Sequence, residues 1–187
     1  MVKLDRIITR GGDGGETSLG DGTRLRKDAR RIACLGALDE ANAAIGLLRA
    51  AGPADPRVDP VLARMQNDLF DLGADLAVPG EGGQRLRVTE AYSLWLEESL
   101  ASFNADLAPL RSFILPGGKL AACHAHVART IIRRAEREVV ALTAEETVNP
   151  EILRVLNRMS DLLFVLSRVL NEKGQADVLW VPGGGQG

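Results

Sequence analysis

Residues 126–137, HVARTIIRRAER, hold the pattern of polar side chains best suited to chemistry. A histidine and three arginines follow one another at steps of three, four and four residues: His126, Arg129, Arg133 and Arg137. A helix would place all four on one face. Guanidinium groups give a polyphosphate paired, charge-assisted hydrogen bonds and stay charged at neutral pH. A solvated outer face balanced by Glu136 and Glu138 is the alternative, and the pattern alone favours that alternative.

The apolar positions of the same segment predict the face that enters the core. They are Leu120, Cys123, Val127, Ile131, Ala135 and Val139, on the side opposite the arginines. Ala128 and Ile132 extend the apolar surface toward the arginines. Such a helix would suit packing on a second partner as well as on its own core, and arginines facing another subunit would form a pocket wall.

The stretch TRGGDGGETSLGDG, residues 9–22, is rich in glycine and also holds hydroxyl, arginine and aspartate side chains. Glycines let backbone N–H groups approach an anion, but the same composition describes a disordered leader. No G-x-x-x-x-G-K-[ST] run is present, and no buried strand precedes the stretch, so neither a P-loop nor a dinucleotide-binding fold is indicated. A phosphate cradle and a tail both stay open.

Two further polar pairs lie within segments of helical period. Asn157 and Asp161 are four residues apart, and Asn157 adjoins a core position, so it needs a hydrogen-bond partner or has a structural role. Asp39 and Glu40 lie between apolar positions, where an inward aspartate would be costly unless a cation pairs with it. An arginine of residues 126–137 is a candidate partner, and simple exposure is the alternative for Glu40.

Metal sites are not indicated by the sequence. No glutamate stands three residues before His124 or His126, as the E-x-x-H motif of di-iron bundles requires. No H-E-x-x-H motif or Cys/His cluster points to zinc, and Cys34 and Cys123 are too few for a disulfide scaffold. We therefore expect no metal bound by protein side chains.

The elements that must position these residues are helices. Apolar residues recur at three- and four-residue steps from Asp28 to the AGPADP break, after Asp59-Pro60, after Thr89, from Lys119 to Glu146, and after Asn149-Pro150. Only LDRII, residues 4–8, and DVLWV, residues 177–181, are strand-like. The pattern predicts an all-α, five-helix up-and-down bundle as one domain over residues 1–180, followed by a flexible tail at 181–187.

Composition is that of an ordinary globular protein. The 187 residues are 45% hydrophobic and 26% charged, and the formal net charge is −2. This charge argues against broad nucleic-acid binding. No signal peptide or membrane-spanning run is present, so we expect a cytoplasmic protein without a membrane partner.

Several motifs in a fixed order resemble the PduO-type ATP:corrinoid adenosyltransferases, which are ferritin-like helical bundles. They are TRGGDGGETSLGDGTRLRKDARR, GALDEANAAIG, FILPGG, HVARTIIRRAER and LNRMSDLLFVLSRVLN, and they cover most of the chain from Thr9 to Asn171. The resemblance implies transfer of the 5′-deoxyadenosyl group of ATP to cob(I)alamin, which gives adenosylcobalamin and inorganic triphosphate. It also implies a homotrimer whose active sites lie between subunits.

The resemblance assigns roles residue by residue. It implies an ATP-binding loop over residues 1–27, with nucleotide contacts from Thr9, Arg10, Gly11, Gly12, Asp13, Gly15, Thr17, Ser18 and Lys27. Further nucleotide contacts would come from Arg133, Arg134, Glu136, Arg137 and Asn157. Asp39 and Arg129 match a salt bridge across the subunit interface. Phe113 matches the aromatic residue that closes the lower face of the corrin ring and leaves cob(II)alamin four-coordinate.

The implied reaction requires the protein to position the two substrates and does not require it to supply a nucleophile. Cob(I)alamin attacks the ribose C5′, and Mg²⁺, arginines and loop amides stabilise the departing triphosphate. A flavin-type reductase and an adenosylcobalamin-dependent enzyme are the implied partners. The alternatives are a non-catalytic carrier of nucleotide or adenosylcobalamin, and an unrelated structural bundle. Gly14 stands where the family often has lysine, which predicts weaker ATP binding.

Overall fold

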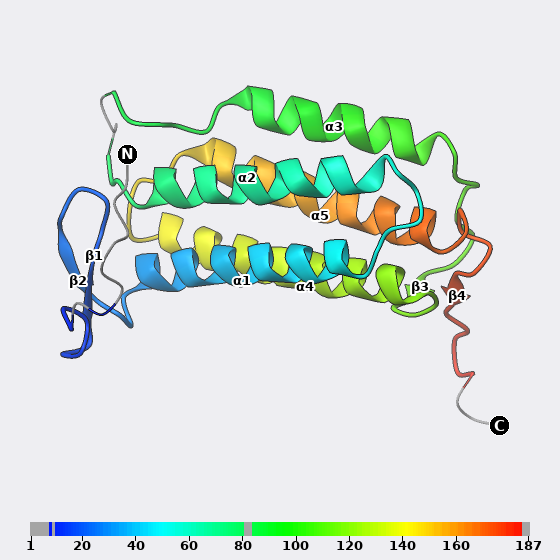
Figure 1. The fold of residues 1–187 in the computed structure, drawn as a ribbon, viewed down its shortest axis with the longest axis horizontal. Helices are drawn as coiled ribbons and strands as arrows, with labels where there is room; N and C mark the ends of the chain where they lie inside the picture. Colours follow the sequence, from blue (N-terminus) through cyan, green and yellow to red (C-terminus); the bar gives the residue numbers. More distant parts are fainter. Residues whose placement is uncertain (1–7, 9, 81–83, 185–187) are drawn as a thin grey trace.

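The computed structural model describes residues 8, 10–80 and 84–184. Within these residues the chain forms α1 (Arg30–Ala50), α2 (Val58–Leu76), α3 (Glu90–Asn104), α4 (Leu120–Thr143) and α5 (Pro150–Leu170). Successive helices run in alternating directions (Figure 1). Helix α1 packs against α2 and α4, and α5 packs against α3 and α4. The predicted five-helix bundle is confirmed.

The start of α5 follows the predicted capping signal. Asn149 is the N-cap, its side-chain oxygen accepts a hydrogen bond from the Glu151 N–H at 3.1 Å, and Pro150 occupies the first turn. The corresponding prediction for α2, with Asp59 as N-cap and Pro60 as the first helical residue, was wrong by two residues. Helix α2 begins at Val58 because Asp55 accepts the Arg57 and Val58 N–H groups.

The ends of α1, α2 and α4 are joined by one buried arginine. Arg31 of α1 donates to Glu146 Oε2, just beyond α4, and to the carbonyl of Leu76 at 2.7 Å. Arg30 binds Glu145 at 2.7 Å. These ion pairs hold the residues that follow α4, so the helix ends at Thr143 instead of continuing to Glu146 as predicted. They also fix α4, which carries the predicted arginines, relative to α1.

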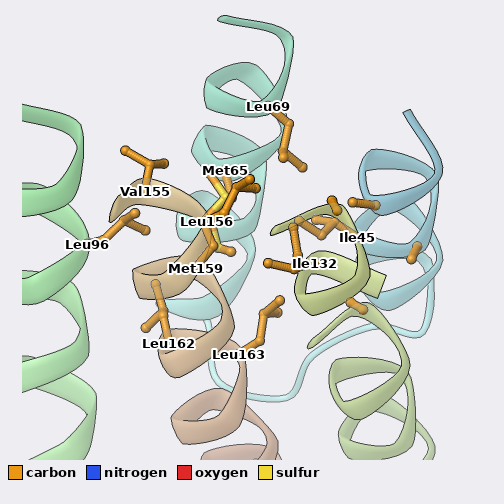
Figure 2. Close-up of a cluster of buried hydrophobic side chains, with 14 of the residues drawn as sticks. Ile45, Met65, Leu69, Leu96, Ile132, Val155, Leu156, Met159, Leu162 and Leu163 are labelled. Carbon is orange, nitrogen blue, oxygen red and sulfur yellow. The ribbon is translucent and has the colours of Figure 1, made fainter. Parts of the chain in front are cut away.

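The hydrophobic core lies between the helices, and α5 supplies more of its buried residues than any other helix. Figure 2 shows Leu156, Met159 and Leu163 of α5 directed into the same interior as Ile45 of α1 and Met65 of α2. Burying a side chain of this size stabilises a fold by roughly 1.5–3 kcal/mol. Helix α5 also buries Val155, Leu162 and Val165, which lie outside the stripe of four- and three-residue steps, because it has neighbours on several sides.

The predicted core face of α4 was wrong in its first half. Leu120 and Val127 are exposed, and His126, predicted on the outer face, is buried with only 3% of its surface exposed. The buried positions are Ala122, Ala125, His126, Ala128, Ile132, Ala135, Val139 and Leu142. Small alanine side chains allow the neighbouring helices to approach closely. Ala128 and Ile132 thus belong to the core of this chain, and the exposed apolar surface of α4 includes Leu120, Val127 and Val140.

Two short hairpins lie at opposite ends of the bundle (Figure 1). Strand β1 (Glu16–Ser18) pairs with β2 (Arg24–Arg26), and β3 (Ile114–Leu115) pairs with β4 (Val178–Leu179), both antiparallel. The strand-like character of residues 177–181 is thereby confirmed in part. Residues 4–7 of the other strand-like piece lie outside the described residues. None of the described helices is long and apolar enough to cross a membrane.

Candidate functional site

The arginines of α4 have different surroundings. Arg134 forms an ion pair with Glu40 of α1. Among the described residues, no carboxylate lies within 4.0 Å of Arg129, Arg133 or Arg137. The interpretation of a face balanced by Glu136 and Glu138 is therefore not supported, and three of the four arginines are left available to an anion.

Glu136 is instead held by α5. Asn157 Nδ2 donates to Glu136 Oε1 at 3.1 Å, and Asn157 Oδ1 accepts from Arg158 Nη1 at 3.1 Å. Arg158 is in turn bound to Glu97 of α3 at 2.6 Å. The half-buried asparagine thus has the hydrogen-bond partners that its position requires, and it lies beside the turn of α4 that carries Arg133 and Arg137.

A cleft of about 770 Å³ opens at the end of the bundle where β3 and β4 pair. Its lining includes Phe113, Trp180 and Phe164, together with His126 and Arg129 of α4. Phe113 is 77% exposed. The volume falls in the range of small-molecule and cofactor sites, which combine apolar walls with a few polar groups.

A second cleft of about 500 Å³ adjoins the first. The two clefts share Leu110, Arg129 and Phe164, and the second also reaches Arg133 and Asp161. An apolar, aromatic-lined space therefore continues into a space lined by arginine. This arrangement suits a ligand that is largely apolar beside one that carries several negative charges.

Burial changes the electrostatics of the shared wall. It lowers the pKa of His126, which the charge of Arg129 lowers further, so the imidazole is neutral at neutral pH. Burial, together with the charge of Arg133, also lowers the pKa of the Arg129 guanidinium. Among the described residues, neither ring nitrogen of His126 has a hydrogen-bond partner. Arg129 Nε has none either. A ligand or another chain can supply hydrogen-bond partners for these nitrogen atoms.

The glycine-rich stretch forms the β1–β2 hairpin over its described part. Leu19 is buried, and the Gly20 N–H binds the Ala77 carbonyl at 2.9 Å, which anchors the hairpin to the end of α2. A side chain at Gly12 would lie 3.0 Å from Lys27 Nζ, so the backbone and the lysine are close. Thr9 lies outside the described residues. Residues 16–26 are thus an anchored hairpin, and residues 10–15 lead into it through turns.

The hairpin and the arginines are not brought together within one chain. In the described part, no hydrogen bond or ion pair joins residues 12–27 to Arg129, Arg133 or Arg137. The remaining predicted hairpin residues, Arg10, Gly11, Asp13, Gly15, Thr17 and Ser18, lie on the hairpin or just before it. Within the described part of one chain, the predicted hairpin residues from Gly12 to Lys27 therefore do not bond to these arginines.

Asp39 is exposed on α1, so its carboxylate does not need a partner in the core of this chain. It lies at a third cleft of about 380 Å³ between α1 and α2, beside Leu35 and Phe70. Phe70 is 71% exposed. Within the described residues, no cation lies within 4.0 Å of Asp39, and Arg129 is on α4.

Sequence reasoning did not find the full lining of the first cleft. Phe164, Leu110, Ser112 and Trp180 were not predicted as site residues. Phe164 follows Asp161 by three residues on α5, and this spacing was the available signal. The position of Trp180 follows from the pairing of β4 with β3, which has no local signal.

Comparison with known proteins gives consistent results. Residues 7–170 match the family model for cobalamin adenosyltransferase. The chain is 47% identical over 179 residues to a cobalamin adenosyltransferase of Cupriavidus metallidurans, with 95% of each protein covered. It is 46% identical over 188 residues to a corrinoid adenosyltransferase of Mycobacterium tuberculosis, with 98% of this chain and 96% of that protein covered.

Solved structures agree with these relatives. A variant of the PduO-type ATP:corrinoid adenosyltransferase from Lactobacillus reuteri, complexed with cobalamin and ATP, superposes with a TM-score of 0.88 at 35% identity, covering 94% of this chain and 99% of that one. Another variant of that enzyme, complexed with ATP, gives a TM-score of 0.86. The resemblance found in the sequence is confirmed. The chain belongs to the PduO-type corrinoid adenosyltransferase family, transferases that form adenosylcobalamin from ATP and a corrinoid.

Proposed function

We propose that adenosyl transfer takes place along α4, with the corrinoid in the cleft of Phe113 and the triphosphate of ATP at Arg133 and Arg137. The observation that carries this assignment is the arginine set of α4. Three of its members have no ion pair among the described residues, and Arg129 lines both adjoining clefts. Arg129 is half-buried, and a half-buried cation without a counter-ion is costly, so a polyanionic ligand stabilises it. Arg133 and Arg137 are exposed and accessible to the phosphates.

A second copy of the chain completes the proposed site. Its hairpin, with Thr9, Arg10, Gly11, Gly12, Asp13, Gly15, Thr17, Ser18 and Lys27, would supply the remaining nucleotide contacts. Asp39 lacks a cation and Arg129 lacks a carboxylate within the described chain, so an Asp39–Arg129 pair between copies satisfies both. Exposed Phe70, Val127 and Val140 supply apolar surface for the contact. In a closed homotrimer, each subunit would place its Asp39 surface against one neighbour and its Arg129 surface against the other.

The bond changes require little from protein acids or bases. The cobalt(I) electron pair forms the Co–C bond at C5′ of the ribose, and the C5′–O bond breaks with its electrons leaving on triphosphate. Arg133 and Arg137 would stabilise the charge on that leaving group, and Arg134 would stay bound to Glu40. Asn157 and Glu136 would fix the nucleotide by their paired hydrogen-bonding groups. Phe113 would exclude the lower axial ligand of cob(II)alamin before its reduction.

Magnesium has no ready-made protein site in this arrangement. The described residues contain no group of three or more His, Cys, Asp or Glu side chains able to hold a metal ion. Mg²⁺ would therefore enter with the nucleotide on its phosphate oxygens, where it supplies positive charge. We assign no step of the reaction to a protein-bound metal.

The test is an adenosylation assay with reduced cobalamin, ATP and Mg²⁺, followed by the absorption change of the corrinoid. Arg133→Ala should lower kcat by about 100- to 1,000-fold, the usual loss when a transition-state hydrogen-bond donor is removed. Arg154→Ala is the matched control, because Arg154 is an exposed arginine of α5 that pairs locally with Glu151. Unchanged turnover in Arg133→Ala would refute the assignment.

The spectrum of bound cob(II)alamin distinguishes an enzyme from a non-catalytic carrier. A four-coordinate species that appears only when ATP is added supports an enzyme, whereas unchanged five-coordinate cobalt supports a carrier. We further propose a cytoplasmic setting in which a flavin-type reductase supplies electrons and an adenosylcobalamin-dependent enzyme takes the product. Release of adenosylcobalamin to such an enzyme can be followed in the same assay.

A further inference from the structure

Phe113 and Trp180 are joined through both their backbones and their rings. Phe113 directly precedes β3, and Trp180 directly follows β4. The Trp180 N–H donates to the Phe113 carbonyl at 2.8 Å, and Ser112 Oγ donates to the Trp180 carbonyl at 2.8 Å. The ring centroids are 6.0 Å apart, with the planes at 63°. The indole thus meets the phenyl ring in the edge-to-face arrangement that aromatic pairs favour.

Both strands of this contact are fixed to one buried amide. Asn171, which follows α5, is fully buried. Its Oδ1 accepts the Lys119 N–H at 2.9 Å, and its Nδ2 donates to the Gly117 carbonyl at 3.1 Å and to Asp177 Oδ1 at 3.2 Å. A side chain at Gly118, where φ is +94°, would overlap this amide. The segment that follows Phe113 and the segment that precedes Trp180 therefore share an anchor.

A buried ion pair fixes the residue that precedes β4. Arg168 of α5 binds Asp177 at 2.9 Å, with both side chains almost fully buried. Arg168 also donates to the Ala108 carbonyl at 3.0 Å. Since buried charges are stable only when their partners keep good geometry, this pair restricts where β4 can begin. We call residues 112–119 and 177–180, with this anchor, the clasp.

We propose that Trp180 is a positioning residue that orients the Phe113 ring through the clasp. Phe113 is 77% exposed and Trp180 44% exposed, so the packing of the chain interior does not fix the phenyl ring. A side chain of this kind is otherwise free to change rotamer at its first torsion. The edge of the indole limits that freedom and holds the ring toward the cleft that both residues line.

The consequence concerns the coordination of cobalt. This step rests on the proposed function, in which the Phe113 ring occupies the space of the lower axial ligand. A ring held in one orientation excludes that ligand more completely than a ring that moves among rotamers. Trp180 then acts on the corrinoid through Phe113 and makes no contact with cobalt.

The experiment uses the full chain with cob(II)alamin, ATP and Mg²⁺. Trp180→Ala should lower the four-coordinate fraction and kcat by roughly two- to tenfold, the factor expected for loss of one aromatic pair. The KM for ATP should stay within about twofold, because the clasp lies at the far end of α4 from Arg137. Trp180→Phe keeps an aromatic edge and should retain most of the four-coordinate species. Val181→Ala is the control, since Val181 is exposed and outside the pairing.

A double variant tests the positioning role itself. In a Phe113→Ala background, Trp180→Ala should have no further effect on the four-coordinate fraction, because the ring that it orients is gone. Effects that multiply would show that Trp180 packs on the corrinoid directly, and they would overturn the proposal. Ser112→Ala, which removes one backbone contact of the clasp and leaves both rings, should reproduce part of the loss even if Trp180→Ala unfolds.

The two proposals fail in different ways. If the unmodified chain forms no adenosylcobalamin, the proposed function is wrong. If it does, and Trp180→Ala shows the same four-coordinate fraction and kcat as the unmodified chain, only the positioning role of Trp180 is wrong.

Discussion

Asn157 of α5 donates a hydrogen bond to Glu136 of α4 at 3.1 Å, and this contact joins the two helices beside the arginines of α4. Arg158 donates to the same asparagine at 3.1 Å. The amide is thus used as a donor on one side and an acceptor on the other. Aspartate has a similar shape, but it cannot donate when ionised.

Asn157→Asp should therefore raise the KM for ATP on the order of tenfold, because two carboxylates would face each other where one hydrogen bond now lies. Steady-state kinetics measure this change, with thermal unfolding as a check that the helices remain paired. Asn67→Asp is the matched control, since Asn67 of α2 is exposed and bonds only to the Ala63 carbonyl. A KM within twofold of the unmodified enzyme would contradict a nucleotide role for Asn157.

Gly14 offers room for the lysine that many family members carry at this position. A Cβ at Gly14 would meet no atom within 4 Å, and the residue is not among the described glycines with positive φ. Gly14→Lys should lower the KM for ATP by roughly two- to tenfold, the effect of one added exposed, charge-assisted hydrogen bond. Gly14→Ala supplies the control for the backbone. If the lysine variant leaves the KM unchanged or raises it, the missing cation does not limit ATP affinity.

The sequence predicted those parts of the fold that depend on local signals. Asn149 and Pro150 begin α5 because a cap and a first-turn proline act within a few residues of themselves. Periodicity located all five helices for the same reason. It misplaced the buried face of α4, because apolar side chains occur all around its first turns and only neighbouring helices decide which of them are covered.

The residues of the site also differ in whether a local signal in the sequence predicted them. The spacing of Arg129, Arg133 and Arg137 predicted that they share a face, because one helix carries all three. Phe113 came from family resemblance, since no local pattern around it indicates a ligand. Asp39 stood out by its position between apolar residues, but only the resemblance placed it at a subunit interface. Trp180 and Asn171 are placed by contacts between segments that are distant in the sequence, such as the 2.9 Å bond from the Lys119 N–H to Asn171, 52 residues later. The roles of Trp180 and Asn171 could therefore be inferred only from the folded structure.

Asp39 and Arg129 give a direct test of the contact between subunits. Asp39→Arg and Arg129→Asp should each weaken assembly at least about tenfold, because each places two like charges at the proposed contact. The double variant reverses the pair and should restore the mass, measured by light scattering during size-exclusion chromatography over a range of concentrations. Glu98→Arg on the exposed side of α3 is the control. Equal masses for the two single variants and the unmodified chain would exclude this pair from the interface.

Asp68 makes the stability of the fold depend on pH. This carboxyl is buried on α2, one of its oxygens has no partner among the described residues, and Arg64 approaches only to 3.7 Å. Burial raises the pKa of Asp68 to about 6 from 3.8. The folded chain therefore keeps a proton that the unfolded chain has already released, and the free energy of unfolding falls as pH rises through this window.

Asp68→Asn should remove that loss. At pH values above the folded pKa, the variant should be more stable than the unmodified chain by about 1–3 kcal/mol, and the advantage should disappear at about pH 4. Urea unfolding at several pH values measures the difference, and Glu98→Gln controls for removal of an exposed charge. A difference that is the same at both ends of the pH range would show that the cost of burying the Asp68 charge is not its cause.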